Sequence, residues 1–213
     1  MTVNVSINAD GISKAAVWAA AITGQIGYAS SRALNDVAKA AVVDLNQSTS
    51  TYFDRPTSFT TRGYYVAQYS NKRDLRGLYV VLDLRPIQAR YLTPSIVGGT
   101  RPQRPSERKA QNLDAWRPGR DARLNTSGNI SKAEAVRALK GGPKYFRLDQ
   151  RRGKLPAGVY RRLAGGKYVQ NILLFNALPV IPKRWPINRI AAESANKNWP
   201  VSFSHWIKES MRT

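Results

Sequence analysis

Residues 12–47 contain no proline, and this uninterrupted segment restricts the possible folds of the chain more than any other feature. Apolar side chains recur along it at the spacing of one helix face, at Ile12, Ala16, Ala19, Ile26, Ala29, Ala33, Val37 and Ala40. The spacing predicts a single long helix. Alanine dominates this stripe, and small side chains let another helix or a sheet approach closely. We therefore expect the stripe to be a face through which copies of the chain assemble.

The rest of the chain alternates between strand and helix patterns. Ser131 and Glu134 form a capping box at the start of a predicted helix that ends at Gly141. A C-terminal helix is expected over 187–211, with a break at Pro200. Strands are predicted over residues 3–7, 64–69, 78–84, 144–148 and 168–175. The expected fold class is α+β: a long N-terminal helix packed on an antiparallel β-sheet, a C-terminal helix, and a basic irregular insertion in the middle.

Positive charge is concentrated in the middle of the sequence. The chain carries 34 Lys and Arg against 13 Asp and Glu, a net charge of +21. Residues 101–162 hold 17 of the basic residues and only five acids, whereas residues 1–54 have a net charge of −1. Proline and glycine are frequent in the same region. We therefore expect a single domain over residues 1–213, with residues 98–162 forming a basic, extended and loop-rich insertion.

Such a charge implies polyanionic or acidic partners. The insertion contains aromatic side chains, such as Trp116, among its cations, an arrangement that can bind phosphate backbones and stack on bases. The alternative is that its arginines pack against acidic faces of neighbouring proteins. The candidate contact residues are Arg101, Arg104, Arg108, Lys109, Arg117, Arg120, Arg123, Arg151 and Arg152.

Several classes of chemistry find no support in the sequence. The chain has no cysteine and a single histidine, His205, and its acids are dispersed without a paired metal-binding motif. No glycine-rich phosphate loop is present. We therefore expect no catalytic residues, no cofactor, no metal and no small-molecule substrate. The most apolar stretch, residues 15–22, is too short to cross a bilayer, so no membrane association is expected.

Five phrases, in order along the chain, resemble a family of phage and prophage minor tail proteins. They are residues 33–38 (ALNDVA), 53–60 (FDRPTSFT), 91–99 (YLTPSIVGG), 155–160 (LPAGVY) and 172–175 (ILLF). The layout is also similar to that of tail-completion proteins of lambda-type phages, which combine an Ala-rich N-terminal helix, a very basic middle and an amphipathic C-terminal helix.

The resemblance implies a non-enzymatic structural protein of a tailed-phage particle, located in the tail or at the head–tail junction and in the host cytoplasm before assembly. Its partners would be copies of itself, in a ring or sleeve, and other neck or tail proteins, with possible nonspecific contact to packaged DNA. The alternative hypothesis is a nucleic-acid-binding protein without sequence specificity.

Overall fold

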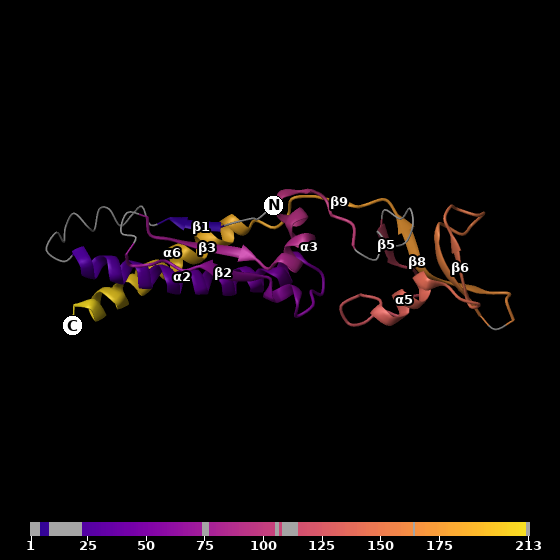
Figure 1. Cartoon of the computed structure of the whole chain (residues 1–213), viewed down its shortest axis with the longest axis horizontal. Coiled ribbons are helices and arrows are strands. Elements are labelled where there is room, and N and C mark those ends of the chain that lie inside the picture. Colours follow the sequence, from indigo (N-terminus) through magenta and orange to yellow (C-terminus); the bar gives the residue numbers. More distant parts are fainter. Residues whose placement is uncertain are drawn as a thin grey trace. The chain divides into compact units, whose positions relative to one another are not determined.

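The chain folds into two compact units in the computed structural model, which describes residues 5–8, 23–73, 77–104, 107, 115–163 and 165–211. One unit combines residues 1–96 with residues 183–213, and the other comprises residues 97–182. The second unit is therefore inserted into the first in sequence. The elements of both units are labelled in Figure 1.

Two long helices form the base of the first unit. Helix α2 spans Thr23–Tyr52 and α6 spans Ile187–Ser210, and they lie side by side (Figure 1). The pair is antiparallel, because Trp185, just before α6, bonds Ser48 near the end of α2, and Trp206 bonds Asp36. Buried side chains on both helices are small, such as Ala33 on α2 and Ala191 on α6, which permits close packing.

A three-stranded antiparallel sheet in the order β1-β3-β2 covers these helices. Its strands are β1 (Val5–Asn8), β2 (Tyr64–Gln68) and β3 (Tyr79–Leu84). Burial alternates along β3: Val80, Leu82 and Leu84 are buried, while Tyr79 is exposed. The buried set packs with α2 side chains such as Leu34 and Leu45 in one hydrophobic core.

Two short helices close the end of the first unit. The 3-10 helix η1 spans Thr60–Arg62 and α3 spans Pro86–Val97, with Leu92 and Ile96 buried in the core. Trp185 is fully buried beside them, with its ring edge-on to those of Phe53 and Tyr64. Its indole nitrogen donates to Ser48 Oγ at 2.8 Å, so its only polar atom is satisfied.

The second unit contains a four-stranded antiparallel sheet in the order β5-β8-β7-β6. The strands are β5 (Ala115–Pro118), β6 (Tyr145–Leu148), β7 (Gly158–Arg162) and β8 (Val169–Asn176). Helix α5 (Lys132–Lys140) packs Ala135 and Ala138 on one face of this sheet, against Trp116, Val159, Ile172 and Leu173. A two-stranded pair, β4 (Gly99–Thr100) with β9 (Val180–Ile181), joins the beginning and the end of the unit.

The α+β class, the long helix, the C-terminal helix and the antiparallel sheets are confirmed. The capping box is present, since Ser131 Oγ accepts a hydrogen bond from the Glu134 backbone N–H at 3.2 Å. Residues 12–22 of the predicted long helix lie outside the described residues. The predicted break at Pro200 does not occur, and α6 continues through it. Pro200 has no N–H to donate to the carbonyl of Asn196, but both residues are on the exposed side of the helix.

The middle of the chain is more regular than the sequence predicted. Instead of a loop-rich insertion over 98–162 within one domain, residues 97–182 form a compact unit with its own hydrophobic core. The physical reason is that β8, at 169–176, pairs with β5 on one side and β7 on the other. The apolar strand beyond the basic segment thereby organises that segment into a sheet.

Candidate functional site

The described part of the predicted assembly face is buried inside the chain, which corrects that prediction. Ile26 is 7% exposed, and Ala33 and Val37 are fully buried. Helix α2 contacts both α6 and the sheet, so its small side chains serve the close packing of these elements within one molecule. Ile12, Ala16 and Ala19 lie outside the described residues.

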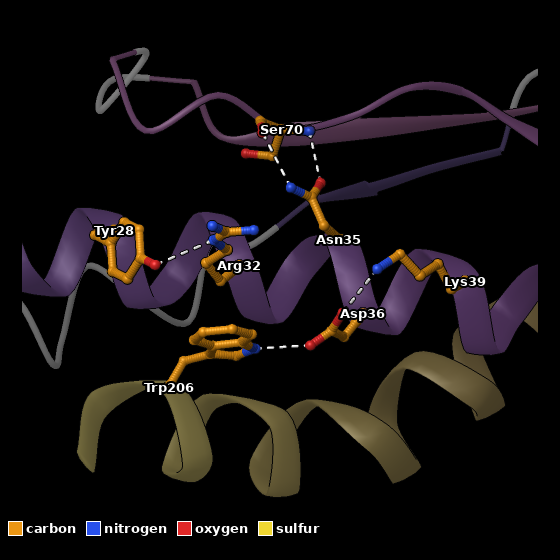
Figure 2. Close-up of polar contacts among 7 residues, drawn as sticks. All are labelled: Tyr28, Arg32, Asn35, Asp36, Lys39, Ser70 and Trp206. Atoms are coloured by element: carbon orange, nitrogen blue, oxygen red, sulfur yellow. Dashed lines mark hydrogen bonds and ion pairs between the residues drawn. The ribbon is translucent and has the colours of Figure 1, made fainter. Parts of the chain in front are cut away.

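Polar contacts hold α2 to its neighbours on both sides (Figure 2). Trp206 of α6 donates from its indole nitrogen to Asp36 Oδ2 at 2.7 Å, and the Arg32 guanidinium lies 5.3 Å from the Trp206 ring centroid. On the other side, Asn35 makes two hydrogen bonds to the backbone of Ser70, at 3.1 Å and 2.8 Å. These contacts bridge distant segments of one chain, so we assign them to folding.

Glu107 is a buried carboxylate within the basic unit. Its side chain is fully buried and forms a bidentate ion pair with Arg101, with nitrogen–oxygen distances of 2.6 Å and 2.9 Å. It also accepts hydrogen bonds from the backbone N–H groups of Arg104 and Trp116. Burial opposes its negative charge, but these donors outweigh burial and hold the pKa of the Glu107 carboxyl below its ordinary value.

Two of the predicted polyanion contacts, Arg101 and Arg104, make side-chain contacts within the fold. Arg101 is only 11% exposed in its side chain and is paired with Glu107. Arg104 stacks over the Trp116 ring at 5.4 Å, and burial lowers the pKa of its guanidinium. Arg101 is thus engaged within the fold, whereas Arg104 is exposed and remains a candidate partner contact. Arg108 and Lys109 lie outside the described residues.

The remaining predicted cations are on the surface. Arg117, Arg123, Arg151 and Arg152 are exposed, and the Arg120 side chain is 91% exposed. Arg120 also borders a pocket of about 240 Å³, together with Lys154. The other lining residues are Asp121, Leu155, Pro156, Tyr160, Val169, Asn171 and Leu174.

The pocket lies on the sheet face opposite to α5. Tyr160 pairs with Asn171 there, and the adjacent Val159 pairs with Leu173 and packs against the helix; a register irregularity between Val159 and Tyr160 separates the two pairs. The amide of Asn171 is buried and has no hydrogen-bond partner among the described residues. A side chain in place of Gly119 would come within 1.9 Å of its Oδ1. The rim carries the cations Arg120 and Lys154 together with the acid Asp121, which pairs with Arg120 at 3.5 Å.

A second surface feature lies at the end of the first unit, which we call the Phe59 patch: Phe59, Ile87 and Tyr91, with Arg62 and Arg90. The three apolar side chains are 50%, 63% and 36% exposed. Ile87 and Tyr91 are one turn apart on α3 and so share a face of that helix. Phe59 lies in the loop before η1. Arg62 follows it by three residues, Arg90 lies three residues after Ile87 on α3, and both arginines are exposed.

Hydrogen bonds fix the loop of this patch to α3. The buried Gln88 donates from Nε2 to the Phe59 carbonyl at 3.1 Å, and the Tyr91 hydroxyl lies 3.2 Å from Thr60 Oγ1. Burial raises the pKa of Tyr91, although its bond to Thr60 acts in the opposite direction. Two of the phrases quoted above, 53–60 and 91–99, therefore meet at one exposed surface.

Sequence reasoning missed Glu107, Asn171 and the Phe59 patch. Glu107 offered one signal: it is an isolated acid among basic residues, which is typical of an internal ion pair. The patch and the Asn171 pocket depend on long-range pairing that no local pattern reveals. His205 is exposed on α6, with its ring edge-on to that of Trp206 at 5.1 Å.

No group of three or more His, Asp or Glu side chains within the described ranges could hold a metal ion. Nor does this part of the chain include a helix that is both long and apolar enough to span a bilayer. Comparison with models of protein families, with curated proteins and with solved structures finds no match for this chain.

Proposed function

We propose that the protein is a non-enzymatic structural component of a tailed-bacteriophage particle, at the neck or in the tail, as a tail-completion or minor tail protein. It acts by oligomeric assembly, as a ring or sleeve, and by contact with other virion proteins. Closed symmetry is the common way for identical subunits to satisfy complementary surfaces.

The observation that carries the proposal is the meeting of two separate phrases at the Phe59 patch. Phe59 and Thr60 come from the phrase 53–60, and Tyr91 begins the phrase 91–99. The Tyr91 hydroxyl and Thr60 Oγ1 are 3.2 Å apart, and the patch exposes apolar side chains. Residues that resemble a virion family and converge on an exposed apolar surface support a role in protein–protein contact.

The test is to purify particles of the phage or prophage that encodes the chain and to quantify the protein by mass spectrometry against the major capsid protein. We expect a small, constant copy number across the density-gradient peak that survives a wash in 0.5 M NaCl. Disruption of the gene should leave heads and tails unjoined or incomplete, and expression in trans should restore them. Absence from washed particles would contradict the proposal.

A second candidate function, nucleic-acid binding without sequence specificity, is favoured by the charge of the inserted unit. Residues 97–182 hold 18 basic residues against five acids, a net charge of +13, and Arg120 and Lys154 border a pocket that also contains Tyr160. Each phosphate neutralised contributes about −0.9 to the slope of log K against log salt on duplex DNA.

Salt dependence separates this function from the nonspecific adhesion of any basic protein. A nucleic-acid-binding role predicts binding to a DNA fragment that persists at physiological salt and weakens when Arg120 and Lys154 are both replaced by Gln. Loss of binding at that salt, with retention of the chain in particles, would favour the structural role.

A further inference from the structure

We propose that the Phe59 patch binds an acidic segment of a second virion protein, which places apolar side chains between Phe59, Ile87 and Tyr91 and carboxylates against Arg62 and Arg90. The inference deepens the proposed function and rests on it for the setting in which this partner is met. Four observations support it: exposure, rigidity, charge and residue type.

The Phe59 patch is both exposed and held rigidly. Ile87 is 63% exposed and Phe59 is 50% exposed, whereas Gln88, which follows Ile87 in α3, is buried. Gln88 bonds the Phe59 carbonyl, and Thr57 Oγ1 lies 3.0 Å from Thr60 Oγ1. A partner therefore meets a surface that is already ordered, which lowers the entropic cost of binding.

The loop also holds one residue in an uncommon backbone conformation. Arg55 has φ of 44°, and it is the only residue other than glycine with a positive φ among those described. This region is unfavourable for a long side chain, the more so when a proline follows, as Pro56 does here. Its side chain is 61% exposed and pairs with Asp54 beside it.

The charge of the surface selects the partner. Residues 54–62 and 85–91 include Arg55, Arg62, Arg85 and Arg90, with Asp54 as the single acid. A second copy of the chain docked patch to patch would bring these arginines together, and like charges across an interface are unfavourable. The complementary occupant carries carboxylates around its apolar side chains.

The residue types favour a protein over a lipid surface. All the cations of these two segments are arginines, whose planar guanidinium binds carboxylates in a bidentate manner. Tyrosine, phenylalanine and arginine are enriched at protein interfaces, where lysine is depleted. Anionic membranes, by contrast, attract lysine and arginine alike.

The variant that tests the patch is Ile87→Glu, with Val201→Glu as the matched control. Both positions are exposed on helices, at 63% and 72%, so both variants should fold like the wild type. We expect Ile87→Glu to reduce incorporation into particles at least tenfold, because a carboxylate would be placed against the carboxylates of the partner. Val201→Glu should incorporate normally.

The outcomes separate this inference from the proposed function. If the wild type is absent from particles, both the proposed function and the inference of a virion partner are wrong. If the wild type is present and Ile87→Glu incorporates equally well, the inference alone is wrong. A loss shared equally by Ile87→Glu and Val201→Glu would also overturn it.

Photo-crosslinking identifies the occupant. Phe59→p-benzoylphenylalanine in assembled particles should yield one major product, to a segment of another virion protein with net negative charge. Crosslinks only to a second copy of the chain, or to a neutral or basic segment, would overturn the inference. So would binding to vesicles of phosphatidylserine and phosphatidylcholine that Ile87→Glu abolishes and Val201→Glu does not.

Discussion

At the scale of single residues, Glu107 shows how a very basic unit can hold a carboxylate without solvent. Each of its two oxygens accepts one hydrogen bond from Arg101 and one from a backbone N–H group, so both oxygens are paired. Replacing one partner of a buried ion pair leaves the other charge uncompensated, which is more costly than losing an exposed pair.

We predict that Glu107→Gln lowers the free energy of unfolding of the inserted unit by about 3 kcal/mol. The control is Asp149→Asn, because the Asp149 side chain is 72% exposed in its pair with Arg147, and we expect a change within about 0.5 kcal/mol. Chemical denaturation followed by Trp116 fluorescence, in a background with the other tryptophans replaced by phenylalanine, measures both. Equal effects of the two substitutions would contradict a stabilising role for the buried Glu107–Arg101 pair.

The same residue sets a dependence on pH. Since the folded-state pKa of Glu107 lies below its ordinary value of 4.5, its stabilisation is fully present above that value and is lost as the pH falls through the folded-state pKa. The wild type should therefore lose stability in acid more steeply than Glu107→Gln does.

At the scale of elements, the α2–α6 pair depends on small side chains. Ala33 is fully buried on α2, and Ala192 on α6 is exposed. We predict that Ala33→Leu lowers the free energy of unfolding by about 1–3 kcal/mol, because added methyl groups force the packed elements apart. Ala192→Leu, the same change at an exposed site, should have little effect. Thermal unfolding with equal midpoints for both variants would contradict internal packing of the stripe.

The elements also show what the sequence could and could not predict. Periodicity predicted α2 because its apolar spacing is sustained, and the capping box predicted α5. Helix α3 was missed because it contains Pro94, whose absent N–H would otherwise bond the Arg90 carbonyl. Strand β7 was missed because Gly158 and two arginines obscure its alternation, and its formation depends on pairing with β8.

The candidate site was also predicted only where local sequence was sufficient. Local composition identified the exposed cations of the inserted unit, such as Arg120 and Arg151. Composition could not distinguish them from Arg101, whose role is set by a single acid six residues away. Nor could it place Phe59 beside α3, because that contact joins a loop to a helix that follows two strands later in the chain.

At the scale of the whole molecule, charge divides between the units. Residues 97–182 have a net charge of +13, which leaves +8 for the larger unit. We predict that raising NaCl from 0.02 to 0.3 M stabilises the inserted unit by about 1 kcal/mol, or about 5 °C in Tm, by screening its self-repulsion. Hydrogen exchange of backbone amides in β7 and β8 measures this unit separately. A lower protection at the higher salt would contradict the prediction.

The insertion of one unit into the other also sets an order of synthesis. A ribosome releases α2 and the strands of the larger unit first, then the whole of residues 97–182, and only then α6. At roughly 5–20 residues per second, the roughly 100 residues between β3 and α6 take about 5–20 s to translate. During that interval the face of α2 that will contact α6 has no helical partner. The α2–α6 pair, which holds much of the core of the larger unit, therefore cannot form until the last helix of the chain has been made.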